Sequence, residues 1–158
     1  MAFNGTWKMT SSEGVAAFSK SIGTPDEEIA KNMEFGNPDA DNIEELNVTA
    51  DSVTLKVSIG GKVFREATVP IGKESEEVAM DLRPAKHTVT IDGNTITRIQ
   101  KGAGYEATIK RTVEGDVMTV VMTGPGGAVG TRNTRESRAS EPVTKQTLLF
   151  IRIHVHNK

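Results

Sequence analysis

The feature that most constrains the fold is a change in the spacing of apolar residues near residue 43. After this point apolar and polar residues alternate, as in the run Val53, Leu55, Val57 and Ile59. This alternation is typical of a strand with one buried face, and the glycine pair at 60–61 that follows is typical of a hairpin turn. We therefore predict a strand over 53–59 that returns as a second strand over 63–69.

The same pattern recurs along the rest of the chain, with turn signals about every 8 to 12 residues. Strands predicted over 87–91 and 95–99 flank Asp92-Gly93, and strands over 105–113 and 117–122 flank a second glycine-containing turn. Consecutive hairpins form an antiparallel meander, and a long meander avoids exposed edges by closing on itself. The sequence thus favours a closed all-β barrel. Its 158 residues are enough for one domain with an enclosed core.

The segment before residue 43 follows a different period. A short strand over 3–10 carries the single tryptophan, and then Val15, Phe18 and Ile22 recur at helical spacing. Ser11 and Ser12 are candidate N-caps for this first helix, which spans about two turns.

A second helix is predicted directly after the first. Thr24 is placed to cap it and Pro25 occupies its first helical position. Its apolar face consists of Ile29, Ala30 and Met33. Two amphipathic helices this short are not stable alone in water, so we expect both to lie on the barrel.

The C-terminal part contains two candidates for the strand that closes the barrel. Residues 128–135 form a weak strand pattern, and after a polar run over 136–146 a much stronger one spans Leu148–Val155. We divide the chain into a barrel domain over 1–135 and a C-terminal extension over 136–158, which consists of a polar linker and then an extra strand. A tail of this kind is also able to recruit a protein partner by adding a strand to a sheet.

Several dispersed motifs, in the correct order, resemble the intracellular lipid-binding proteins, the family of fatty-acid-binding and cellular retinoid-binding proteins. They are Phe3-Asn4-Gly5-Thr6-Trp7-Lys8-Met9, Lys20-Ser21-Ile22-Gly23, Ile71-Gly72 with Glu76-Glu77, Val89-Thr90-Ile91-Asp92-Gly93 with Gln100-Lys101, and Thr108-Ile109-Lys110-Arg111. The resemblance implies an up-and-down antiparallel barrel of about ten strands with a helix-turn-helix lid after the first strand. The sequence departs from the family at Gly102, where a tryptophan is common, and at Val15, where an aromatic residue is usual.

The resemblance also implies a lipid site inside the barrel. Arg111 and Arg132 would bind the carboxylate of a fatty acid or retinoid, and Thr134 stands where the family has a phenol. A buried guanidinium is costly unless paired, and a carboxylate ligand supplies strong bidentate hydrogen bonds. Arg152, in the stronger C-terminal strand, is the rival of Arg132, and we assign the role to Arg132 because its spacing from Arg111 fits the family better. From the lid, Val15, Phe18 and Met33 would form the roof of the cavity.

Composition argues against other functions. Nineteen basic residues against 21 acidic ones, spread along the chain, indicate no nucleic-acid surface. There is no cysteine and no catalytic Ser/His/Asp order. His154 and His156 share one strand face but lack a third ligand, so we predict no metal site and no cofactor.

We therefore expect a non-enzymatic carrier of a long-chain fatty acid. Carriers of a retinoid, a bile acid or a haem-breakdown pigment are the alternatives. No signal peptide and no run of roughly 18 apolar residues is visible, which favours the cytoplasm. We expect a monomer that contacts membranes transiently through its helical lid.

Overall fold

The computed structural model describes residues 2–137 and forms one ten-stranded antiparallel sheet. The strands are β1 (Gly5–Glu13), β2 (Asn42–Val48), β3 (Ser52–Ile59), β4 (Lys62–Pro70), β5 (Ser75–Val78), β6 (Pro84–Asp92), β7 (Thr95–Gly102), β8 (Tyr105–Glu114), β9 (Val117–Thr123) and β10 (Val129–Glu136). Two helices, α1 (Val15–Ser21) and α2 (Asp26–Phe35), follow β1, and two short 3₁₀ turns, η1 (Pro38–Ala40) and η2 (Pro125–Gly127), complete the set. The predicted barrel with a two-helix lid is confirmed.

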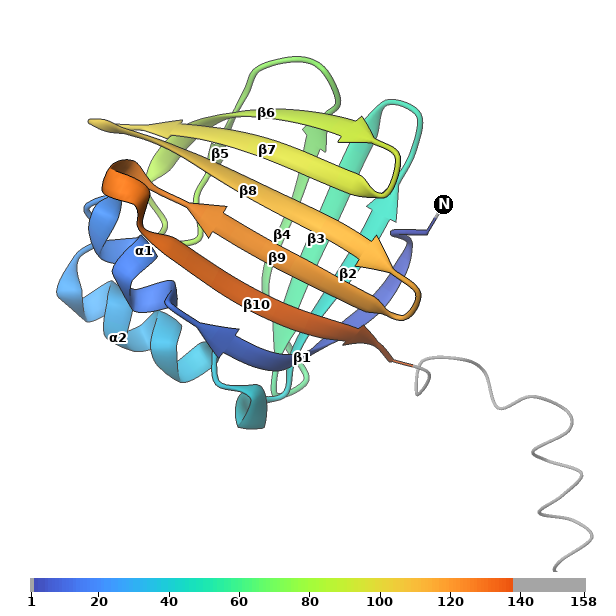
Figure 1. The fold of residues 1–158 in the computed structure, drawn as a ribbon, viewed down its shortest axis with the longest axis horizontal. Helices are drawn as coiled ribbons and strands as arrows, with labels where there is room; N and C mark the ends of the chain where they lie inside the picture. The colour runs from blue at the N-terminus through green and yellow to red at the C-terminus, as the bar shows by residue number, and fades with distance from the viewer. Residues whose placement is uncertain (1, 138–158) are drawn as a thin grey trace, which may run out of the picture.

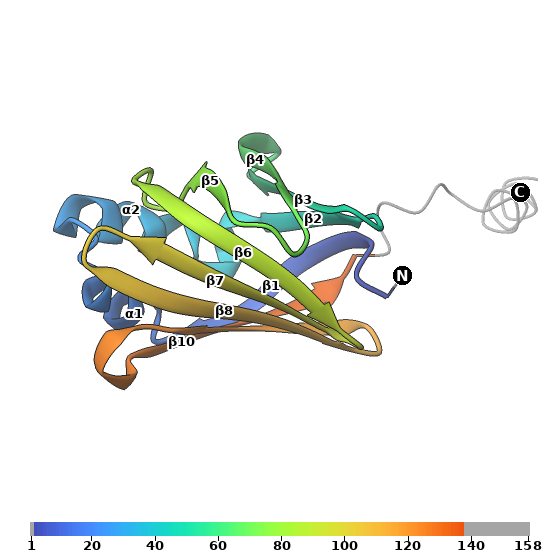
Figure 2. The same cartoon turned by 90° about the horizontal axis from the view of Figure 1, so that it is seen from above.

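The strands are hydrogen-bonded in the order β4-β3-β2-β1-β10-β9-β8-β7-β6-β5. The sheet curls into a nearly closed barrel, with β4 and β5 at the two ends of the order (Figures 1 and 2). β10 pairs with β1, in a register that places Arg132 opposite Ser12. The closing strand is therefore the weaker of the two candidates. The stronger candidate, Leu148–Val155 with Arg152, lies outside the described residues, as does most of the predicted extension over 136–158.

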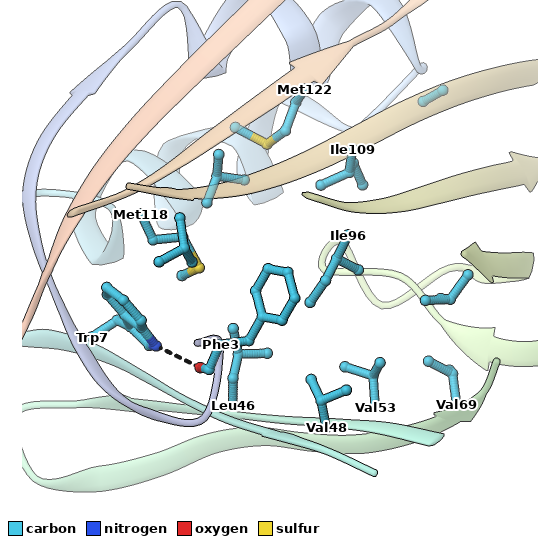
Figure 3. Close-up of a cluster of buried hydrophobic side chains, with 14 of the residues drawn as sticks. Phe3, Trp7, Leu46, Val48, Val53, Val69, Ile96, Ile109, Met118 and Met122 are labelled. Carbon is cyan, nitrogen blue, oxygen red and sulfur yellow. Dashed lines mark hydrogen bonds between the residues drawn. The ribbon is translucent and has the colours of Figure 1, made fainter. Parts of the chain in front are cut away.

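The apolar core lies between opposing walls of the barrel. Phe3 and Trp7 are buried, and Phe3 lies among Met118, Leu46 and Ile96 (Figure 3). The Trp7 indole N–H donates to the Phe3 carbonyl at 3.0 Å, so the one polar atom of this large side chain has a buried partner. No helix within residues 2–137 is long and apolar enough to cross a membrane.

Helix α1 packs on the ends of β9 and β10 and against α2, so both helices lie over one end of the barrel (Figure 1). A glycine allows the close approach. A Cβ built on Gly124 would lie 2.1 Å from the Ser21 Oγ and 3.3 Å from the Phe18 Cδ2. Any larger residue at 124 would force the Ser21 and Phe18 side chains to shift.

The predicted helix caps are wrong. β1 continues to Glu13, so Ser11 and Ser12 belong to the strand, and Gly14 precedes α1 without a side-chain cap. Thr24 does not cap α2, because its hydroxyl donates to the Asp81 Oδ2 at 2.9 Å. Tertiary hydrogen bonds have replaced the local ones that the sequence favours.

Candidate functional site: a cavity lined by arginines

The barrel encloses a hollow with two adjoining lobes. The helix lobe lies beneath the lid and is lined by α1, β8 and β9, together with Arg132 of β10. The sheet lobe lies among β3 to β7 and includes His87 and Arg65. The lobes share Leu55, Ala79, Met80, Arg98 and Arg111. The two lobes therefore adjoin at the arginines Arg98 and Arg111.

Apolar side chains form most of the helix lobe. Val15 and Phe18 come from α1, whereas Ile109, Val120 and Met122 come from β8 and β9. All five are buried. Walls of this kind suit the hydrocarbon part of a ligand, because each methylene removed from water contributes roughly 0.8 kcal/mol to binding.

One ion pair crosses the cavity. The Arg111 Nη2 on β8 donates to the Glu44 Oε1 on β2 at 3.4 Å, and both side chains are buried. Within the described residues, the other carboxylate oxygen of Glu44 and the Nε of Arg111 have no hydrogen-bond partner. The pair is therefore only partly satisfied, and a polar group that entered the cavity would find free donors beside it.

Two further guanidiniums face the cavity without an ion pair or hydrogen bond among residues 2–137. They belong to Arg132 on β10 and Arg98 on β7, and the Nε of each is buried. Both side chains are half-buried and line the helix lobe. Burial lowers the pKa of Arg132, while Glu44 raises it and Arg111 lowers it. Burial, with the charges of Arg111 and Arg65, lowers the pKa of Arg98 to about 9. With its pKa at about 9, Arg98 remains cationic near neutral pH.

A second polar cluster ties the lid to the β5–β6 turn. The guanidinium of Arg83 donates to the Asp81 Oδ2 at 2.6 Å and to the Ile22 carbonyl at 2.7 Å, while Thr24 donates to the same carboxylate. Burial alone would raise the pKa of Asp81, but the hydrogen bonds from Arg83 and Thr24 hold it below its usual value. This cluster fixes the connection between α1 and α2 over the cavity.

The chain is similar in sequence to proteins of known function. It is 31% identical over 124 residues to fatty acid-binding protein 1 of Manduca sexta, which covers 78% of this chain and 89% of the relative. It is 32% identical over 123 residues to the liver-type fatty acid-binding protein of Epinephelus coioides, which covers 78% and 90%. The chain belongs to the fatty-acid-binding protein family. The predicted resemblance is confirmed, although no family model matches the sequence.

Solved structures of this family have the same fold. The REP1-NXSQ fatty acid transporter superposes with a TM-score of 0.73 at 26% identity, over 85% of this chain and 95% of the other. A Schistosoma mansoni fatty acid binding protein in complex with arachidonic acid gives a TM-score of 0.75 at 22% identity, over 86% and 96%. The second likeness is evidence for the fold only.

The structure brings four of the six predicted site residues of this family member into one lobe. Val15, Phe18, Arg111 and Arg132 all line the helix lobe. The other two, Met33 and Thr134, line neither lobe. Met33 is 48% exposed on α2 and does not line the cavity. The buried apolar residue of that helix is Ile29. Thr134 is buried but donates to the Met118 carbonyl at 3.1 Å, which commits its hydroxyl to the barrel wall.

Sequence reasoning missed two site residues, Glu44 and Arg98. Glu44 lies on the same strand face as the buried Asn42 and Leu46, and this alternation was the available signal. Arg98 shares a face with the buried Ile96 and Gln100, but the neighbouring Ile99 makes the opposite parity equally plausible from sequence. The absence of a tryptophan at Gly102 also has an explanation. A Cβ there would lie 2.1 Å from the Tyr105 ring, which covers the glycine and accepts a hydrogen bond from Gln100 at 2.7 Å.

Proposed function

We propose that this protein is a carrier that reversibly binds a long-chain fatty acid or a similar hydrophobic carboxylate in the barrel cavity, and that it catalyses no reaction. The observation that carries the proposal is the Arg132 guanidinium, which faces an apolar cavity without an ion pair among the described residues. A carboxylate is the ligand group that such a guanidinium binds best, through paired charge-assisted hydrogen bonds.

The rest of the lobe supports this assignment. Arg111 lies beside Arg132 and is already partly neutralised by Glu44, so Arg132 is the stronger of the two attractions for a new anion. The acyl chain would lie against Val15, Phe18 and the apolar walls of β8 and β9. The relatives named above are fatty acid-binding proteins.

We further propose that the carrier acts as a cytoplasmic monomer and releases its ligand during transient membrane contact through the lid. Two large apolar side chains support the last part. Met33 on α2 is 48% exposed and Leu82 in the β5–β6 turn is 62% exposed, and the Arg83 cluster joins that turn to the lid. Solvent-exposed apolar side chains of this kind suit an interface with lipid.

Displacement of a fluorescent apolar probe tests the carrier function. Addition of hexadecanoic acid should displace the probe from the full chain in a saturable manner. Hexadecanol should compete more weakly, because it lacks the charge that Arg132 binds. The absence of saturable competition by any fatty acid, retinoid or bile salt would refute the proposal. Turnover of a lipid ester by the purified protein would refute the statement that it catalyses nothing.

A further inference from the structure

The cavity contains more cationic than anionic side chains. Among the described residues that line it, Arg65 pairs with Glu77 at 3.9 Å and also donates to the Ala79 carbonyl. Arg111 pairs with Glu44. These pairs account for four of the charges. Asp81, the remaining carboxylate, is held by Arg83 at 2.6 Å. Arg98 and Arg132 are then two guanidiniums with no carboxylate of their own.

Arg98 and Arg132 occupy different positions in the cavity. Arg132 lines only the helix lobe, whereas Arg98 borders both lobes and lies nearer to His87 and Arg65. On β7 it points inward with the buried Ile96 and Gln100, and its register partner on β8 is Ile109, so the strand geometry holds it in the cavity.

One bound carboxylate does not neutralise both of these guanidiniums. A fatty acid at Arg132 supplies one negative charge, after which Arg98 is still a buried cation without a counter-charge. Removing an ion from water is expensive unless a partner of opposite sign compensates for it. The complement of the residues that line this cavity is therefore two negative charges attached to an apolar skeleton.

We propose that Arg98 forms a second anion-binding subsite, so that the preferred ligand of this carrier is a long-chain dicarboxylic acid with one carboxylate at Arg132 and the other at Arg98. This inference rests on the proposed carrier function. Its support is the cavity-facing position of Arg98, the buried Nε without a partner among residues 2–137, and the excess of guanidiniums around the two lobes.

Calorimetric titration of the full chain with three matched ligands tests the proposal. They are hexadecanedioic acid, its monomethyl ester and hexadecanoic acid. The ester keeps the length and shape of the diacid but removes one charge. We expect the diacid to bind at least about tenfold more tightly than the ester, which corresponds to 1.4 kcal/mol. Dodecanedioic acid extends the series and reports the separation of the two subsites.

Arg98→Gln should abolish the preference for the diacid over the ester, and it should cost the diacid at least about tenfold more affinity than it costs hexadecanoic acid. Arg135→Gln is the matched control, because Arg135 lies on β10, is exposed and pairs with Asp116 outside the cavity. This control should keep both affinities. Thermal unfolding of the ligand-free Arg98→Gln variant should occur at or above the wild-type temperature, since an unpaired buried charge has been removed. If the Arg98→Gln variant does not fold, the same measurements are made on Arg98→Met.

Three outcomes would overturn the inference. Equal affinity of the wild type for the diacid and its ester would show that no second subsite exists. An equal loss for diacid and monoacid in the Arg98 variants would show that one carboxylate is shared by Arg98 and Arg132. Binding of two hexadecanoic acids as tightly as one diacid would assign Arg98 to a second monoacid. If none of the three ligands binds, the carrier function itself fails.

Discussion

Replacement of Arg132 by Gln distinguishes the contribution of the ligand's charge to binding from the contribution of its apolar chain. The guanidinium lies inside the helix lobe, has no hydrogen bond or ion pair among the described residues, and is on the closing strand β10. Glutamine is shorter and keeps a polar amide, but it carries no charge. The change should therefore weaken binding of the carboxylate and leave contacts with the hydrocarbon walls intact.

The size of the effect follows from the environment of the group. A hydrogen bond to a charged partner contributes about 1.5–3 kcal/mol to binding. Because Arg111 remains and retains a free Nε, we take the lower half of that range, which corresponds to a loss of roughly tenfold to fortyfold in affinity. Hexadecanol has no carboxylate, so its affinity should change by less than about threefold. The free energy of unfolding of the ligand-free protein should not fall, because a buried unpaired charge is removed.

The assay is displacement of a fluorescent apolar probe by hexadecanoic acid and by hexadecanol. Arg135→Gln on the same strand is the control, since that side chain is exposed and pairs with Asp116 at 3.3 Å. Equal losses for acid and alcohol would refute the reasoning, because they would indicate damage to the cavity. Unchanged affinity for the acid would show that Arg132 does not bind the headgroup. Loss of the acid preference on replacement of Arg152, with Arg132→Gln unaffected, would transfer the role to the C-terminal extension.

Three further predictions concern the lid, the interior histidine and the Gly102 contact. Phe18→Ala should weaken hexadecanoic acid more than octanoic acid, because the buried ring lines the helix lobe; equal losses in the titration would indicate general destabilisation instead. The pKa of His87 is lowered by burial and then by the charge of Arg98, so the unfolded chain binds a proton more readily than the folded one. The free energy of unfolding should therefore be constant above the unfolded pKa of about 6.5 and fall as the pH is lowered below it, by at most about 1.4 kcal/mol per pH unit. Urea unfolding between neutral pH and about pH 5 measures this slope; it should be shallower for His87→Gln, and an unchanged slope would assign the pH dependence to other groups. Gly102→Ala should cost about 1–3 kcal/mol of stability, because the new Cβ would overlap the Tyr105 ring; the cost should largely disappear in a Tyr105→Ala background, and its persistence there would place the strain elsewhere.

Much of this fold is readable from the chain itself. Alternation in runs such as Val53 to Ile59, followed by glycine-containing turns, specifies hairpins because a strand buries every second side chain and a tight turn needs a residue that tolerates a positive φ. The helical spacing of Val15, Phe18 and Ile22 is equally local. The position of Arg111 on an inward-facing strand followed from the family motif that contains it, and its buried placement agrees with the alternation of β8.

Only the tertiary structure decided which strand closes the barrel and which charges meet inside it. The weak segment Val129–Glu136 pairs with β1 because pairing depends on register and partners as well as on strand propensity. Thr24 donates a hydrogen bond to Asp81, 57 residues away, and does not cap α2 as predicted. Glu44 accepts a hydrogen bond from Arg111, 67 residues away. Met33 fits the helical period but faces solvent, because the angle at which α2 lies on the barrel is set by its neighbours. Contacts between residues so distant in sequence depend on the closure of the whole sheet, which no local pattern encodes.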